Sequence, residues 1–140
     1  MATHAPITDL DADDALIAVL IAAMESSGHA SAAEAERAHH IIWSTRRFHD
    51  REGGDVERRI ERMRLLIGER GAAPVLEAGA KKLSARLRPS AFALAADLVL
   101  VDGRMERLEA KFLRSLAADL GLDTAEAERI LDVIRLKNSA

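Results

Sequence analysis

The most distinctive group of residues that could bind a ligand or a metal lies at an acidic turn, Asp102-Gly103-x5-Glu109. Its spacing matches the second half of a calcium-binding EF-hand loop, which follows the pattern D-x-[DN]-x-[DN]-G-x5-E. Counting back from the glycine, the first and third ligand positions fall on Leu98 and Leu100. Leucine side chains carry no oxygen, so the sequence excludes a complete EF-hand cage at this turn.

Four carboxylates nevertheless lie around this turn, and they are the candidate metal ligands Asp97, Asp102, Glu106 and Glu109. Two or three carboxylates with a free carbonyl hold a divalent cation weakly. The alternative is a capping box, in which Glu106 is the N-cap of the next helix and Glu109 its third residue. Both interpretations stay open, and a divalent cation is the one cofactor that the sequence suggests.

Asp97 differs from the other three acids because it is the only charge inside the apolar stretch 91–101. A buried carboxylate without a partner costs several kcal/mol, so it needs an arginine, a helix N-terminus or a bound ion. A position at the solvent-facing edge of the helix would satisfy it equally well.

A second metal motif to consider is Glu36-x-x-His39, which matches the Glu-x-x-His unit of di-iron helical bundles. Such a site also needs a second unit of this kind and two further inward-facing glutamates. The chain has no second unit, so a carboxylate-metal enzyme is a rival hypothesis only. Cysteines, a Gly-rich phosphate loop, a nucleophile elbow and a helical zinc-protease motif are also absent, and we predict no enzyme.

The only tryptophan lies off the expected core face of a helix over 31–48. Glu36, His40, Trp43 and Arg47 recur at helical spacing on one side. The inward stripe on the other side consists of Ala35, Ala38, Ile41, Ile42, Thr45 and Phe48. Trp and Arg are typical hot-spot residues of interfaces, so the first four form a candidate partner-binding face. The alternative is that another helix covers Trp43 and makes it part of the core.

Charge is unevenly distributed along the chain, although its net value is only −3. Residues 1–45 carry one Arg and seven acids, whereas residues 46–88 carry twelve bases and seven acids. A basic middle segment can meet an anionic partner such as nucleic acid. The residues for that function are Arg58, Arg59, Arg62, Arg64, Lys81 and Lys82. The favoured alternative is a solvated helical face balanced by the acidic N-terminal segment, so nucleic acid is not the expected partner.

Composition sets the fold class that must position these residues. The 140 residues include 27 Ala and 18 Leu, but three Phe, one Trp and no Tyr. Ala and Leu favour helices, whereas β-branched and aromatic residues favour strands, so we expect an all-α fold. The length fits one domain over 1–140. No apolar run reaches the roughly 18 residues of a membrane span, and we expect a cytoplasmic protein without membrane insertion.

Hydrophobic periodicity and helix-breaking residues predict seven helices. The first five cover about 11–27, 31–48, 55–67, 74–87 and 89–101; the sixth lies between Gly103 and Gly121, and the seventh begins after Asp123 or Thr124. The fifth is apolar nearly all round and is the expected buried central helix. The sixth carries Leu108, Phe112, Leu116 and Leu120 on its inward stripe.

The sequence also contains a degenerate internal repeat with an offset of 75 residues. This offset places Gly28 on Gly103 and Glu34 on Glu109. The first and second predicted helices thus correspond to the fifth and sixth. We expect two pseudo-repeated helical hairpins packed face to face, with the remaining helices at the sides.

The second copy of this repeat carries a recognisable pattern. An apolar helix ends in Asp102-Gly103, Met105 follows two places on, Glu109 lies near the start of the next helix, and Leu120-Gly-Leu ends it. The pattern resembles the tellurite-resistance protein TerB family. The resemblance is good over about 89–136 and looser over 12–49, where Ser27 stands in place of the family's acid.

This resemblance implies an all-α domain of about seven helices with internal pseudo-symmetry, in a cytoplasmic protein without established catalysis. It also implies a link to tellurite and other stress responses, suspected divalent-metal binding through clustered acids, and membrane-associated partner complexes. We therefore expect a non-enzymatic TerB-like domain that binds a partner protein or a second copy of itself.

Overall fold

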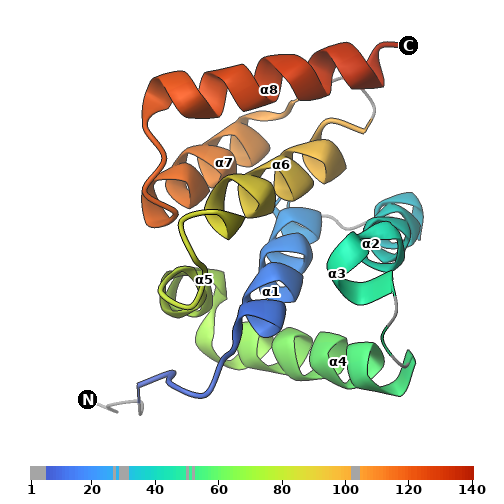
Figure 1. Cartoon of the computed structure of the whole chain (residues 1–140), viewed down its shortest axis with the longest axis vertical. Helices are drawn as coiled ribbons and strands as arrows, with labels where there is room; N and C mark the ends of the chain where they lie inside the picture. Colours follow the sequence, from blue (N-terminus) through green and yellow to red (C-terminus); the bar gives the residue numbers. More distant parts are fainter. Residues whose placement is uncertain (1–5, 27, 29–31, 50, 52, 102–104) are drawn as a thin grey trace.

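A computed structural model describes residues 6–26, 28, 32–49, 51, 53–101 and 105–140. These residues form eight α-helices and no strand, which confirms the all-α prediction (Figure 1). The helices are α1 Ala12–Glu25, α2 Ala32–Ser44, α3 Arg46–His49, α4 Gly53–Arg70, α5 Ala72–Ala80, α6 Leu87–Val99, α7 Arg107–Asp119 and α8 Thr124–Asn138. None of these helices is both long enough and apolar enough to cross a membrane.

The eighth helix arises because the predicted helix over 31–48 is divided at Thr45. The Thr45 hydroxyl donates to the carbonyl of Ile41 at 2.6 Å, and the Ser44 hydroxyl donates to that of His40 at 2.7 Å. Hydroxyl bonds of this kind to a carbonyl four residues back bend helices. The chain therefore turns at Thr45 and continues as α3, which carries Phe48 into the core.

Hydrogen bonds and turn geometry define the start of α1 and the end of α7. The carboxylate of Asp11 accepts from the amide of Asp14 at 2.9 Å, and Asp14 accepts in return from the amide of Asp11 at 3.2 Å. At the end of α7, Gly121 has φ +71°, and the amide of Leu122 donates to the carbonyl of Ala117 at 2.9 Å. This left-handed turn ends α7 where the sequence predicted the end of the helix. Ser31 and Gly103, where two predicted helices begin, lie outside the described residues.

The end of the helix predicted over 74–87 was wrong, since α5 ends at Ala80 and α6 begins at Leu87. Both predicted ends of α4 were wrong as well. Gly68 does not break a helix: α4 continues to Arg70, and Gly71, with φ +86°, separates it from α5. The start was predicted at residue 55, but α4 begins at Gly53, so that Asp55 lies inside its first turn. In both cases α4 packs along α1, and this tertiary contact extends the helix beyond its local signals.

The architecture is two three-helix halves joined through their central helices (Figure 1). In the first half α2 and α4 pack on α1; in the second half α7 and α8 pack on α6; α1 and α6 pack on each other. Both α1 and α2 recur 75 residues later as α6 and α7, which confirms the predicted repeat. The core has two central helices where the sequence predicted one. The more deeply buried one is α1, in which residues 13–23 are all buried.

The predicted inward stripe of α7 needs one correction. Leu108 is 53% exposed, whereas Leu113, which was not predicted, is 2% exposed. Leu116 and Leu120 are buried as expected, and Phe112 is half-buried. The difference arises because α7 packs on both α6 and α5, and these two contacts decide which of its side chains enter the core.

Candidate functional site

The acidic turn caps α7. The amide of Glu106 donates to Oε1 of Glu109 at 3.0 Å, and the two residues form a capping box. Glu109 is buried, with 9% of its surface exposed. The capping interpretation is thereby confirmed, while Asp102 lies outside the described residues. Cation binding at this turn stays a prediction.

Asp97 is held by partners from two other helices. Its carboxylate accepts from Nζ of Lys137 at 3.0 Å, from Nδ2 of Asn138 at 3.1 Å and from Arg37 at 3.3 Å. The carboxylate thus joins α6 to α2 and to the end of α8. Of the alternatives from the sequence, the arginine partner is confirmed. Two cationic side chains already balance the single negative charge of Asp97, which leaves little demand for a metal.

The contacts of Asp97 predict a pH dependence of stability. Burial disfavours its ionised form, but the hydrogen bonds from Lys137 and Asn138 outweigh burial and lower the pKa of Asp97 below the ordinary value of 3.8. A carboxyl with a lowered folded-state pKa stabilises the fold above the unfolded value and loses this contribution as pH falls through the folded value. Asp97→Asn should therefore destabilise the protein at neutral pH and flatten the loss of stability below about pH 4.

Chemical denaturation between about pH 3 and pH 7 measures this effect. Asp132→Asn is the matched control, because the side chain of Asp132 is 74% exposed and pairs with Arg135 at 3.5 Å. An acid-induced loss of stability as steep in Asp97→Asn as in the parent would contradict the role of Asp97.

The capping box leads to a second prediction, in which Glu109→Gln lowers the free energy of unfolding by about 0.5–2 kcal/mol. This loss should be the same with and without Ca²⁺, Mg²⁺, Mn²⁺ or Zn²⁺, because it comes from the cap. Thermal melts in each cation measure it, with Asp102→Asn as the comparison for the predicted metal ligands. Stabilisation by one cation that both variants abolish would instead support a metal site.

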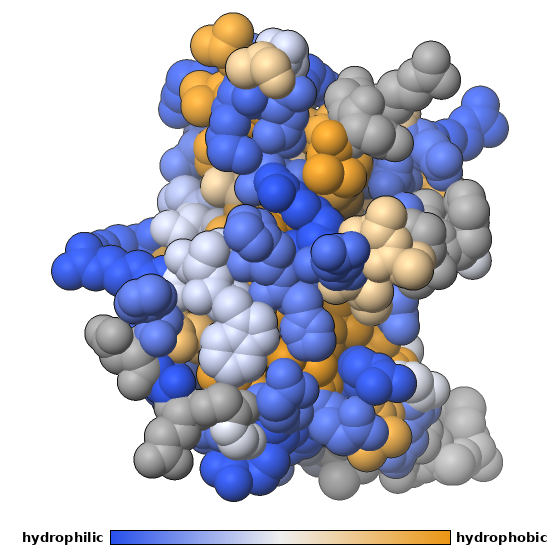
Figure 2. All heavy atoms as spheres, turned by 90° about the vertical axis from the view of Figure 1, so that its right-hand side faces the viewer, coloured by the Kyte–Doolittle hydropathy of each residue, from blue (hydrophilic) through white to orange (hydrophobic). Residues whose placement is uncertain are grey.

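The predicted partner-binding face is divided between two helices. Glu36 and His40 are exposed on α2, and Trp43 is half-buried and packs against the core. Arg47 belongs to α3, where its guanidinium donates to Asp13. The face that carries α2 and α3 shows small, separate hydrophobic patches between hydrophilic side chains (Figure 2).

The histidine motif does not assemble a metal site among the described residues. Nε2 of His39 lies 3.7 Å from the carboxylate of Glu57 on α4, and both side chains are about half exposed. No group of three or more His, Asp or Glu side chains in the described part of the chain is arranged to hold a metal ion.

A buried ion-pair network at the start of α1 was not predicted. Asp13 and Asp14 are 3% and 1% exposed. Asp13 binds Arg47 and Arg51, while Asp14 binds Arg59 at 2.9 Å and Arg62 at 3.2 Å. The opposite charges of the acidic N-terminal segment and the basic middle segment were visible in the sequence. Which residues pair could be seen only in the tertiary structure.

This network accounts for part of the basic middle segment. Arg59 also binds Asp11 at 2.8 Å, and Arg62 binds Asp9 at 2.7 Å. The predicted balance between the basic segment and the acidic N-terminal segment is thereby confirmed for these two arginines. Arg58, Arg64, Lys81 and Lys82 are exposed. The six residues do not form one unpaired basic surface, which weakens the case for nucleic-acid binding.

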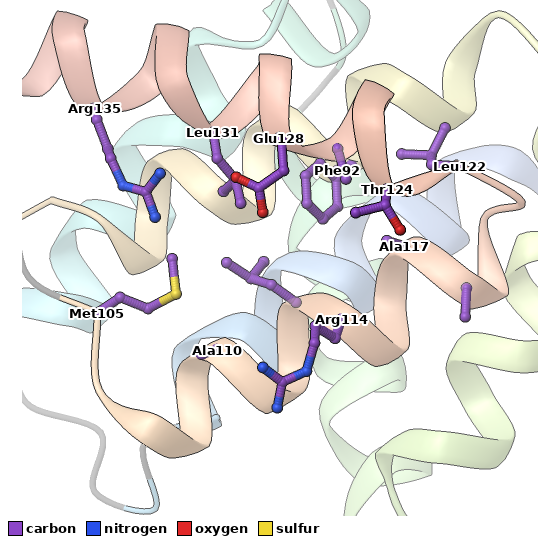
Figure 3. A pocket seen from close by; sticks show the side chains of 13 residues that line it. Phe92, Met105, Ala110, Arg114, Ala117, Leu122, Thr124, Glu128, Leu131 and Arg135 are labelled. Carbon is purple, nitrogen blue, oxygen red and sulfur yellow. The ribbon is translucent and has the colours of Figure 1, made fainter.

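A groove between α7 and α8 is a cavity that the sequence did not indicate (Figure 3). It has a volume of about 500 Å³, and α6 forms its floor. Apolar residues make most of its lining, including Phe92, Met105 and Leu131, while Arg114, Glu128 and Arg135 stand around it. Both α7 and α8 pack on α6, and they diverge from each other. Alanines at positions 110, 117, 118 and 127 leave the space between them unfilled.

The first half of the molecule has a related groove of about 430 Å³. At the offset of 75, five residues of the α7–α8 groove correspond to five residues that line this second groove. In the α7–α8 groove they are Ala110, Leu113, Arg114, Ala117 and Arg135, and their counterparts are Ala35, Ala38, His39, Ile42 and Ile60. The α7–α8 groove is therefore a feature of the repeated three-helix unit and not a local packing accident.

Comparison with protein families gives a match to the model described as Tellurite resistance protein TerB, over residues 13–132. The chain belongs to the TerB family. Comparison with curated proteins and with solved structures gave no match. The TerB match runs from the first turn of α1 to the third turn of α8 and so includes both halves of the repeat.

Within this TerB domain, Trp43 and Ala118 occupy corresponding positions of the two halves. Trp43 is half-buried against the core, whereas Ala118 lines the open α7–α8 groove. Four alanines around one groove are the sequence signal that could have indicated it. Alanine is common throughout this chain, however, so the signal stands out only once the helices are placed.

Proposed function

We propose that this TerB domain is a non-enzymatic binding module that acts in the cytoplasm, in a response linked to tellurite or other stress. Its partner would be a protein that inserts an amphipathic helix into the α7–α8 groove. The observation that carries this proposal is the apolar groove itself, which is unfilled by the described residues of the chain.

The dimensions of the groove suit a helix. Its wall α7 has 13 residues, or roughly 20 Å at 1.5 Å per residue, which matches a partner helix of three to four turns. Helix-in-groove recognition uses apolar side chains at every third or fourth position. Phe92, Leu113 and Leu131 would form the floor for such side chains.

Charge favours an acidic partner helix. Arg107, Lys111 and Arg114 lie at helical spacing along α7, and all three are exposed. Arg135 adds a fourth positive charge from α8, where its pairing with Asp132 at 3.5 Å is weak, and Glu128 is the one acid in the groove lining. Glutamates on the partner would meet the α7 side.

Two amphipathic peptides with the same leucine spacing, one with Glu and one with Lys on the polar face, test this function. We expect the acidic peptide to bind at least about tenfold more tightly in fluorescence anisotropy, which corresponds to about 1.4 kcal/mol. Ala118→Trp should reduce binding by blocking the groove from an exposed position, and Arg114→Glu should reverse the preference. Equal binding of both peptides, or binding unaffected by Ala118→Trp, would exclude the groove.

The α2 surface of Glu36, His40 and Trp43 is the second candidate for a partner or a second copy of the chain. The half-buried state of Trp43 favours it, because an aromatic ring at a surface is typical of an interface anchor. Trp43 is the only tryptophan and does not line the α7–α8 groove, so its fluorescence distinguishes the two sites. A partner on α2 shifts its emission, whereas a partner in the groove does not.

A further inference from the structure

A separate cleft lies where the two halves of the molecule meet, and its charge is uniformly positive. Its volume is about 590 Å³, and Arg46, Arg47 and Arg86 line it without any acidic residue. Residues from the α2–α3 junction form one side, and residues at the start of α6 form the other. The cleft is on different elements from the α7–α8 groove, so its function does not depend on that of the groove.

Two of these three arginines have no ion pair with any acid in the part of the chain that the structure describes. Arg47 is neutralised by the buried carboxylate of Asp13. Arg46 and Arg86 are exposed, and no acid among the described residues forms an ion pair with either of them. Arg59 and Arg62 on α4, by contrast, each bind two or more carboxylates. Two guanidinium groups that line one cleft, with no carboxylate partner among the described residues, attract an anion.

The remaining lining defines the kind of anion. The hydroxyls of Ser84 and Ser90 supply neutral hydrogen-bonding groups, and three leucines supply an apolar surface. The Thr45 hydroxyl also lines the cleft, but its proton is already donated to the carbonyl of Ile41. Ser84 Oγ accepts from the amide of Leu87 at 3.3 Å, which leaves its own proton to donate. Guanidinium groups bind phosphate oxygens in two parallel hydrogen bonds, a geometry that few other side chains offer.

We infer that this cleft binds an organic phosphate, with the phosphate between Arg46 and Arg86 and an apolar moiety on the leucines. An inorganic ion would leave the apolar surface uncovered, and the volume is within the range of small-molecule sites. A nucleic acid would need a longer track of phosphate contacts, and the paired arginines of α4 do not provide one.

Calorimetric titration with phenyl phosphate tests the site, with inorganic phosphate and tellurite as the arms that lack an apolar moiety. We expect saturable binding to phenyl phosphate that is at least tenfold tighter than to either inorganic ion. The double variant with Arg46→Gln and Arg86→Gln should weaken it at least tenfold. Arg129→Gln is the matched control, since Arg129 is exposed on α8 and has no ion pair among the described residues, and this variant should bind like the parent.

Four results would overturn the inference: no saturable binding, an equal loss in Arg129→Gln, inorganic ions that bind as tightly as phenyl phosphate, or tighter binding of a single-stranded oligonucleotide. Circular dichroism and melting of each variant show whether it is folded. Because all three substituted arginines are exposed and none has a carboxylate partner among the described residues, we expect their melting temperatures to match that of the parent.

Discussion

Asp14→Ala lowers the free energy of unfolding by about 3–5 kcal/mol, which is a large part of the stability of an ordinary domain. Asp14 is 1% exposed and receives charged hydrogen bonds from Arg59 and Arg62. Its side chain also accepts from the amide of Asp11 in the capping box of α1. One substitution therefore removes a buried carboxylate that pairs with two arginines, and it removes the hydrogen bond from the Asp11 amide. Arg59 keeps its ion pairs with Asp11 and Asp55, and Arg62 keeps its pair with Asp9.

Urea denaturation measures this loss, and Asp9→Ala is its matched control. The side chain of Asp9 is 79% exposed and also pairs with Arg62, at 2.7 Å. Exposed ion pairs contribute about 0–1 kcal/mol, so Asp9→Ala should have little effect. Equal effects of the two substitutions would show that burial of Asp14 does not govern the strength of this network.

Phe48→Ala should be comparably destabilising, with a loss of about 3–5 kcal/mol. Phe48 has no exposed surface and is among the largest fully buried side chains of the described residues. Its removal leaves a cavity where α3 anchors the first half of the molecule. Trp43→Ala, five residues earlier, should cost about 1–2 kcal/mol because the side chain is only half-buried.

Thermal and chemical denaturation of these two variants will show whether Trp43 is a core residue or part of an interface. If Trp43→Ala destabilises the protein as much as Phe48→Ala, the tryptophan is a core residue and the α2 surface is not an interface. A Trp43→Ala protein that stays folded but no longer associates with its partner supports the interface instead.

The sequence alone determined the fold class, the repeat and most of the helix ends. Each rests on short-range chemistry: helix propensity belongs to single residues, and caps such as Glu106 with Glu109 join residues three positions apart. Leu98 and Leu100 likewise excluded an EF-hand, because a ligand position without oxygen fails in any tertiary setting.

Only the tertiary structure decided which charges and surfaces are available for function. Asp97 pairs with Arg37, 60 residues away, and Asp14 pairs with Arg59, 45 residues away. Charge composition alone does not predict which of the many arginines pairs with a given carboxylate. The α7–α8 groove and the arginine cleft depend on how far apart packed helices lie. Those separations are set by contacts among all the helices at once, so no single segment of the sequence contains them.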